Sequence, residues 1–131
     1  MILPRSLTVW LIIIAAEILH GIVRSILLVP HVGLFRSNQI GVFTGSAIIL
    51  VIALVTARWI GATRPRQLLG IGLLWLILTL AFEFLFGHFV AGASWERIAA
   101  DYDVLQGGLL PFGMIILALS PLIAGKVRGV V

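Results

Sequence analysis

Four long apolar segments, separated by short polar ones, make up most of the chain. They cover about residues 7–29, 40–60, 68–90 and 104–124. A helix needs about 20 predominantly apolar residues to cross the hydrocarbon core of a bilayer, and helices satisfy their own backbone hydrogen bonds there. The pattern therefore predicts an all-α fold, a bundle of four transmembrane helices that forms a single domain over residues 1–131.

The connection after the third segment contains a shorter amphipathic pattern. Apolar residues recur at helical spacing from Trp95 to Tyr102, and Ser94 can cap the N-terminus of a helix there. Because Trp and Tyr favour the headgroup level of a membrane, we expect an interfacial helix over about residues 95–102 in the second outer loop. Its simplest role is an anchor, and a partner-docking surface or a lid over the bundle are the alternatives.

Glycine and proline residues predict where the helices end or bend. Pro30 and Gly33 should end the first helix, so that residues 31–39 form the first outer loop. We expect the fourth segment to be kinked or locally unwound near its outer end, because it contains four residues that weaken helices. These residues are Gly107, Gly108, Pro111 and Pro121.

The second segment carries Gly41 and Gly45, four residues apart. Small residues at this spacing let helix backbones approach closely in lipid. The two glycines are expected to serve packing within the monomer, with a homodimer face as the alternative.

Basic residues indicate how the bundle is oriented. With a cytoplasmic N-terminus, six basic residues lie in the inner segments and two, Arg36 and Arg97, lie in the outer loops. Cytoplasmic loops of membrane proteins are enriched in Lys and Arg, so both termini are predicted to be cytoplasmic. The six inner residues are Arg5, Arg58, Arg64, Arg66, Lys126 and Arg128.

Composition excludes several classes of protein. Hydrophobic residues make up 61% of the chain and charged residues 11%, which is outside the range of soluble globular proteins. The net charge of +4 is spread between the apolar segments, so no basic face is available for a nucleic-acid partner. The chain contains no cysteine, which excludes disulfides and thiolate metal sites.

Ionisable residues inside the first segment form a stripe. Glu17, His20, Gly21 and Arg24 stand at positions i, i+3, i+4 and i+7, which share one face of a helix. An ionisable side chain at the centre of a membrane helix costs about 2.5–3.5 kcal/mol. The stripe is therefore expected to face the interior of the bundle.

Glu83 in the third segment is the expected partner of Arg24. Counted back from the outer ends of their helices, the two residues differ in depth by about 5 Å, and a carboxylate is the best dry partner for a guanidinium group. We therefore predict an interhelical ion pair, and the alternative is that Arg24 extends outward to the headgroups. Glu17 would then pair with His20 and could bind and release a proton or a cation.

Further residues belong to the predicted ligand or proton site. Trp75 and Thr79 share a helix face with Glu83 at steps of four residues. They are secondary candidates, as is His88. The primary site comprises Glu17, His20, Arg24 and Glu83.

A resident metal or cofactor is not expected. Glu17 and His20 have the E-x-x-H spacing of carboxylate-bridged di-iron bundles, but Phe86 occupies the equivalent position in the third segment. A single-metal site built from these two residues with Glu83 and His88 is an alternative, and haem ligation by the two histidines is another. No nucleophile, base and orienting acid can be assembled from so few groups, so an enzyme is the least supported class.

The two halves of the chain share a sequence pattern. The motif E-x-L-x-G begins at Glu17 and again at Glu83, and further identities lie at offsets of 65 to 67 residues. We therefore consider a tandem duplication of a helical hairpin, whose repeats would be parallel because each half has two spans. The matched residues are Trp10, Ala15, Glu17, Leu19, Gly21, Gln39 and Gly41 with Trp75, Ala81, Glu83, Leu85, Gly87, Gln106 and Gly108.

Several motifs carry a resemblance to known proteins. The combination of AEILHG and Arg24 with NQIGVFTGS, WLILTLAFEFLFG and SWERIAADYD resembles small four-helix inner-membrane proteins of bacteria that have no assigned activity. This resemblance covers nearly the whole chain and implies a multi-pass protein of the bacterial inner membrane. Over a short stretch, Ala16 and Glu17 also resemble the small multidrug resistance transporters, four-helix proteins whose first helix carries a proton-coupling glutamate.

Two functions are consistent with these patterns. The chain is either a structural or accessory membrane protein, in which the polar stripe specifies how the helices pack, or a small proton-coupled transporter. In the second case Glu17 and Glu83 bind protons or a cationic or lipophilic substrate. Few polar residues can line an aqueous path, which favours the first. Membrane lipids are the expected partners, and a homo-oligomer or a larger membrane complex is considered.

Overall fold

The computed structural model describes residues 2–90 and 92–130, which form helices and short connections without a β-strand. Among these residues, four helices are long and apolar enough to cross a membrane. The prediction of an all-α four-helix bundle is confirmed. The long helices are α1 (Ile2–Leu27), α3 (Leu34–Ile60), α4 (Pro65–Phe89) and α6 (Leu110–Val127). The short elements are α2 (Val29–Val32), α5 (Trp95–Ala100) and the 3₁₀ helix η1 (Val104–Gln106).

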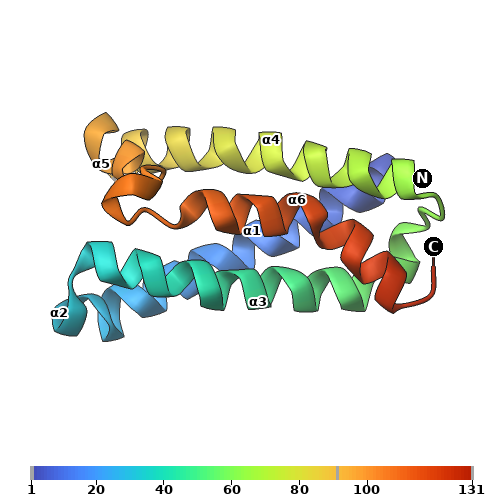
Figure 1. Ribbon diagram of the computed structural model, residues 1–131, viewed down its shortest axis with the longest axis horizontal. Coiled ribbons are helices and arrows are strands. Elements are labelled where there is room, and N and C mark those ends of the chain that lie inside the picture. The colour runs from blue at the N-terminus through green and yellow to red at the C-terminus, as the bar shows by residue number, and fades with distance from the viewer. Residues whose placement is uncertain (1, 91, 131) are drawn as a thin grey trace.

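The long helices lie alongside one another, and successive long helices run in opposite directions (Figure 1). Both α3 and α4 pack along α6, whereas α1 packs mainly against α3 and crosses behind the bundle towards the start of α4. Both termini lie at one end, which we call the basic end. The short elements α2 and α5 lie at the opposite end, which we call the loop end.

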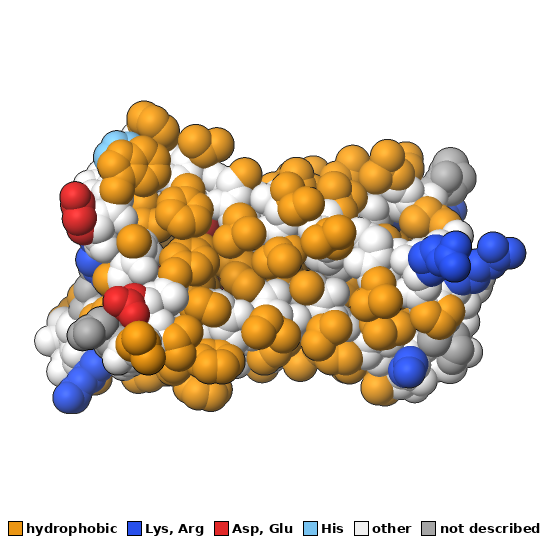
Figure 2. All heavy atoms as spheres, turned by 45° about the horizontal axis from the view of Figure 1, so that its top comes forward, with side chains coloured by type: hydrophobic (Ala, Val, Ile, Leu, Met, Phe, Trp, Pro, Cys, Tyr) orange, Lys and Arg blue, Asp and Glu red, His pale blue; other side chains and the backbone are white. Residues whose placement is uncertain are grey.

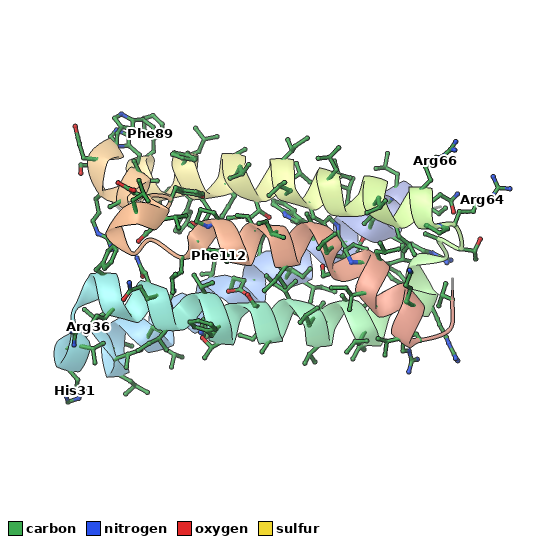
Figure 3. The ribbon with its side chains drawn as sticks, in the orientation of Figure 1. His31, Arg36, Arg64, Arg66, Phe89 and Phe112 are labelled. Atoms are coloured by element: carbon green, nitrogen blue, oxygen red, sulfur yellow. The ribbon has the colours of Figure 1, made fainter. Side chains whose placement is uncertain are left out.

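The surface of the bundle is divided into an apolar waist and charged ends (Figure 2). Large hydrophobic side chains such as Leu11, Val55 and Ile77 are exposed along the helices. Arg64 and Arg66 project from the basic end, and His31 and Arg36 lie at the loop end (Figure 3). An apolar band long enough to match a bilayer, with charges beyond it, is expected of a chain that lies in lipid. The chain is a small multi-pass membrane protein.

An apolar core closes the basic half of the bundle. Its most deeply buried members come from three helices and include Val9, Leu68, Trp75 and Leu117. These side chains fill the interior of the bundle where α1, α4 and α6 meet.

Two tryptophans set the register between α1 and α4, which run in the same direction. The indole of Trp10 donates a hydrogen bond to Thr79 Oγ1, and the indole of Trp75 donates one to the carbonyl oxygen of Ser6, each at 3.0 Å. Both bonds join residues that are 69 positions apart. Between these two bonds, a residue of α1 therefore lies level with the residue 69 positions later on α4.

The first predicted loop is wrong. Residues 31–39 are helical except for Gly33, whose φ of 85° reverses the chain between α2 and α3. The third element begins at Leu34, because the polar residues that suggested a loop form the first turns of a helix. Within those turns Ser37 is completely buried.

The fourth span also begins later than its predicted start at residue 104. The segment Val104–Gln106 forms a separate 3₁₀ turn, and Gly107 follows it with a φ of 91°. The helix then starts at Leu110, with Pro111 in its first turn, where a missing backbone N–H is tolerated. The expected unwinding near this end is thus a complete break in the helix.

The predicted helix in the second loop is present as α5. Ser94 caps it as expected, because its hydroxyl oxygen accepts a hydrogen bond from the backbone N–H of Arg97 at 3.1 Å. The helix ends at Ala100, two residues earlier than predicted.

Candidate functional site

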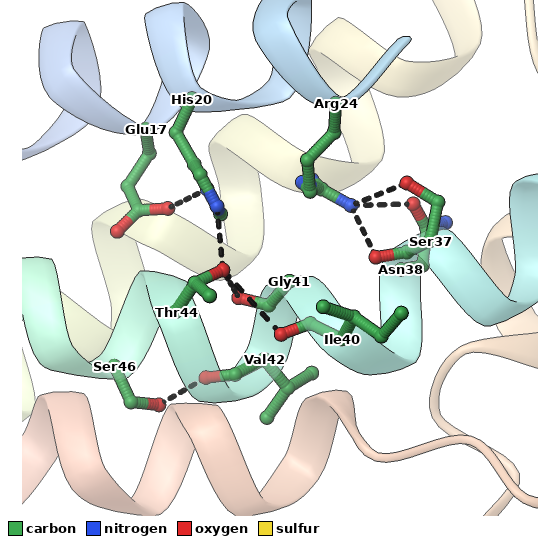
Figure 4. A network of polar contacts seen from close by, with 10 residues as sticks. All are labelled: Glu17, His20, Arg24, Ser37, Asn38, Ile40, Gly41, Val42, Thr44 and Ser46. Atoms are coloured by element: carbon green, nitrogen blue, oxygen red, sulfur yellow. Dashed lines mark hydrogen bonds and ion pairs between the residues drawn. The ribbon is translucent and has the colours of Figure 1, made fainter. Parts of the chain in front are cut away.

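The ionisable stripe of α1 lies beside α3 (Figure 4). Glu17 Oε2 is 3.4 Å from His20 Nδ1, which is close enough for a charge contact but lacks hydrogen-bond geometry. His20 Nε2 lies 2.6 Å from Thr44 Oγ1 on α3. The side chains of Glu17 and His20 are 25% and 14% exposed. The stripe therefore lies mostly within the bundle, at the contact of α1 with α3.

The glycines of α3 provide the space for this stripe. A Cβ on Gly41 would stand 2.6 Å from Cζ of Arg24, and a Cβ on Gly45 would stand 2.8 Å from Oε2 of Glu17. Both distances are too short for real contacts. The two glycines thus serve packing within the monomer, as predicted, and charged side chains of α1 fill the space they leave.

Arg24 is the first member of a chain of polar contacts that links three helices. Its Nη1 donates hydrogen bonds to the carbonyl oxygen of Ser37 at 2.9 Å and to Oδ1 of Asn38 at 3.0 Å. Asn38 Nδ2 donates to Asp101 Oδ2 at 3.1 Å, and Arg97 Nη1 lies 3.2 Å from Asp101 Oδ1. We call this the loop-end chain. It connects α1 to α3 and to the segment that contains α5.

The predicted ion pair between Arg24 and Glu83 is wrong. Within the part of the chain that the structure describes, the two residues do not come within 4.0 Å of each other as an ion pair. The two side chains face common spaces between the helices without forming a direct ion pair. The guanidinium group of Arg24 turns towards α3 instead.

Glu17 and Glu83 line three adjoining spaces in the loop-end half of the bundle. The central cavity, of about 70 Å³, lies among the four long helices and includes Thr79 in its wall. The polar cavity, of about 140 Å³, extends towards the loop end, where Asn38 and Asp101 line it. The lateral crevice, of about 370 Å³, lies between α1 and α4.

Several polar atoms around these spaces have no hydrogen-bond partner. They are Glu17 Oε1, His20 Nδ1 and Arg24 Nε, all of them buried. Glu83 forms no ion pair with another described residue. Buried polar atoms usually have a protein or water partner, and a polar cavity of this size is large enough for water. These atoms are therefore the ones available to water, a proton or a ligand.

The secondary candidates lie in three different places. Thr79 lines the central cavity and accepts the hydrogen bond from Trp10. Trp75 is completely buried in the core of the basic half. His88 lies near the loop end, where its Nδ1 is 2.9 Å from the carbonyl oxygen of Ala93 and its ring stacks on Trp95 with centroids 3.8 Å apart. Only Thr79 joins the acidic residues.

His20 and His88 belong to separate environments, so they do not form a shared haem or metal site. Among the described residues, no group of three or more His, Asp or Glu side chains could hold a metal ion. The polar cavity beside Glu17 and Glu83 is instead lined by three carboxyl groups, one guanidinium group and two amide side chains.

Three polar residues of the site were missed by the sequence analysis: Asn38, Gln39 and Asp101. They line the polar cavity, and Gln39 Nε2 donates a hydrogen bond to the carbonyl oxygen of Gly107 at 2.6 Å. The available signal was the run of Ser37, Asn38 and Gln39. It resembled a loop because Asn38 and Gln39 have partners, Asp101 and Gly107, that lie more than 60 positions away in the sequence.

Tyr102 follows α5 and covers part of the loop end. Its ring stacks on Phe84 with centroids 5.3 Å apart, and its hydroxyl group is buried without a partner. Burial raises the pKa of Tyr102 above its ordinary value, and the nearby carboxyl groups of Glu83 and Asp101 raise it further. The hydroxyl group therefore stays neutral over the physiological range.

Comparison of this chain with protein-family models, with curated proteins and with solved structures gives no match. The two resemblances drawn from its motifs stay predictions.

Proposed function

We propose that this chain is a small proton-coupled transporter of the bacterial inner membrane, in which Glu17 and Glu83 bind a proton or a cationic group. The observation that carries the proposal is that both carboxyl groups line the same three spaces while Arg24 is committed to α3. A carboxyl group held in a partly dry cavity can exchange a proton for another cation. A purely structural role would instead pair Glu83 with a base, since an unpaired charge in the bundle is destabilising, but Glu83 forms no ion pair with another described residue.

The arrangement of open and closed regions supports this proposal. The polar cavity extends towards Asn38 and Asp101 at the loop end, whereas apolar side chains close the basic half. Access from one side corresponds to one state of an alternating-access cycle. In the other state, α1 and α4 would separate at the basic end, where the hydrogen bonds from Trp10 and Trp75 now hold them together.

The experiment that tests the proposal measures protonation of the two acids directly. Infrared spectra of the protein in lipid vesicles, recorded as pH is changed, report the carbonyl stretch of protonated carboxylic acids. Glu17→Gln and Glu83→Gln should each remove part of this titrating signal, whereas Glu96→Gln, on the exposed side of α5, should leave the buried-carboxyl component unchanged. If both variants fold and neither alters that component, the acids do not exchange protons and the proposal fails.

We further propose that both termini face the cytoplasm, because six basic residues lie in the segments at the basic end. The natural chain has no cysteine, so single cysteines can report the side of the membrane. A membrane-impermeant maleimide should label Glu96→Cys in intact cells and Arg66→Cys only after permeabilisation. The reverse labelling would invert the orientation.

An accessory role in a larger membrane complex is the second candidate. It is favoured by the exposed apolar residues at the loop end, where Leu105 is 95% exposed and Phe89 is 71% exposed. A complex that uses this surface should shift in size on a native gel when Leu105→Ser is introduced, while the infrared titration of the acids stays unchanged. Leu11→Ser, at a side chain exposed in the apolar waist, is the control and should leave the size of the complex unchanged.

A further inference from the structure

The lateral crevice combines both signs of charge with an apolar wall. It is formed by α1 and α4 alone, which make few contacts beyond their basic halves. Carboxyl groups and a guanidinium group line the crevice beside aromatic side chains. The residues that line the crevice include Glu17, Gly21, Arg24, Phe82, Glu83 and Phe86.

Arg24 presents unused donors to this crevice. Its Nη1 bonds to α3 and its Nε is buried against Gly41, whereas its Nη2, near Gly21, forms no hydrogen bond with another described residue. Gly21 has no side chain to cover the guanidinium group, since even a Cβ there would stay 3.8 Å from Nη2. The N–H groups of a guanidinium nitrogen can donate charge-assisted hydrogen bonds to a phosphate oxygen.

The depth of Arg24 matches the level of lipid phosphates. Arg5 marks the basic end of α1, and about 20 residues span the hydrocarbon core, so the opposite boundary falls close to Arg24. Glu17 lies seven positions deeper on α1, and Glu83 faces the same crevice from α4. A ligand that enters sideways thus meets the guanidinium group first and the carboxyl groups below it.

The wall of the crevice on α4 is suited to a hydrocarbon chain. Phe82 and Phe86 stack with centroids 4.9 Å apart, and Phe86 is 36% exposed. On the facing helix Ile22 is 51% exposed. An acyl chain can lie against these side chains while the polar head occupies the space between the helices.

We propose that the lateral crevice binds the headgroup of a zwitterionic phospholipid of the ethanolamine type, with its phosphate on Arg24 and its ammonium group directed to Glu83 and Glu17. An anionic lipid without an amine would meet two carboxyl groups, and a cationic amphiphile without a phosphate would meet the guanidinium group. Only a headgroup that carries both charges complements the crevice. The inference rests on the proposed function, because it uses the same carboxyl groups.

The test is a competition between lipids, read by native mass spectrometry. Protein taken from vesicles of equal parts phosphatidylethanolamine and phosphatidylglycerol should retain the ethanolamine lipid with a preference of at least about tenfold, as expected for charge-assisted hydrogen bonds. Arg24→Gln should reduce retention of both lipids, and Glu83→Gln should abolish the preference between them. Arg36→Gln and Glu96→Gln, at exposed positions outside the crevice, should behave as the natural protein does.

Four results would overturn the inference. They are equal retention of the two lipids by the natural protein, no change in folded Arg24→Gln, no change in folded Glu83→Gln, and displacement by dodecyltrimethylammonium, a cation without a phosphate. Size-exclusion chromatography in detergent establishes that each variant is folded. The infrared titration separates the two proposals, because acids that titrate without any lipid preference leave the proposed function intact and refute only the lipid site.

Discussion

The guanidinium group of Arg24 occupies the place where a side chain on Gly41 would stand, 2.6 Å from the position of a Cβ at that residue. Small residues in membrane helices are usually explained by close contact of helix backbones. In this protein Gly41 of α3 leaves space for the guanidinium group of Arg24 from α1, which then donates hydrogen bonds to Ser37 and Asn38. Burial of the charge thus depends on the absence of a side chain in the neighbouring helix.

Gly41→Ala should therefore displace the guanidinium group of Arg24 and break its hydrogen bonds to α3. We expect a loss of about 1–3 kcal/mol in the free energy of unfolding, as for buried hydrogen bonds to charged groups, measured by denaturant titration in mixed micelles. Gly21→Ala is the matched control, because its Cβ would be at an ordinary contact distance of 3.8 Å from Arg24. Equal stability of the two variants would contradict this account of Gly41.

Gly72 and Gly70 offer a comparison two residues apart in α4. A Cβ on Gly72 would lie 1.7 Å from the carbonyl oxygen of Ala118 in α6, whereas a Cβ on Gly70 would meet nothing within 4 Å. Gly72→Ala should force the two helices apart. The free energy of unfolding should fall by about 1–3 kcal/mol or more, the range typical of overpacked cores. Gly70→Ala should be neutral or slightly stabilising, because Ala favours helix. Thermal unfolding in detergent measures the stability of both variants. A Gly72→Ala protein as stable as the natural one would refute the close contact between α4 and α6.

Trp75→Phe should loosen the basic end of the bundle. The indole of Trp75 is completely buried and donates its hydrogen bond to Ser6, so the variant loses that bond and leaves a cavity. We expect a loss of about 1–3 kcal/mol in stability and faster proton access from the basic side in vesicles. Trp59→Phe, at a side chain that is 47% exposed, should change neither quantity.

Asp101→Ala should release the segment that contains α5 from the bundle. Asp101 is the only described residue that joins Asn38 to Arg97 in the loop-end chain. Hydrogen exchange measured by mass spectrometry should become faster across α5 and η1 while α6 stays protected. Asp103→Ala, at an exposed position two residues later, should leave the exchange unchanged. Unaltered exchange in both variants would show that the chain of contacts does not hold the segment.

The ionisation of Tyr102 can be followed without interference, because it is the single tyrosine in the sequence. Burial raises the pKa of Tyr102, so tyrosinate absorbance should appear well above pH 10 in the folded protein. The folded state then holds this proton more tightly than the unfolded state. Stability from this group is complete below the ordinary tyrosine pKa of about 10 and should be lost as pH rises above it. Tyrosinate formation near pH 10 in folded protein would show that the hydroxyl group is exposed.

The sequence predicted the apolar spans because lipid imposes a length and a composition on any helix that crosses it. The cap at Ser94 and the break near Gly107 were also predictable, since both depend on the local chemistry of one or two residues. The face shared by Glu17, His20 and Arg24 followed from helical spacing alone.

The partners of those residues were decided by the tertiary structure. The prediction that Arg24 pairs with Glu83 assumed that depth can be counted from loop positions, but hydrogen bonds from Trp10 and Trp75 shift α1 along α4. The polar residues at the start of α3 resembled a loop because their partners come from distant segments of the chain. Periodicity along one helix determines which side chains share a face, whereas the relative shift of two helices depends on packing over their whole length, which no local pattern contains.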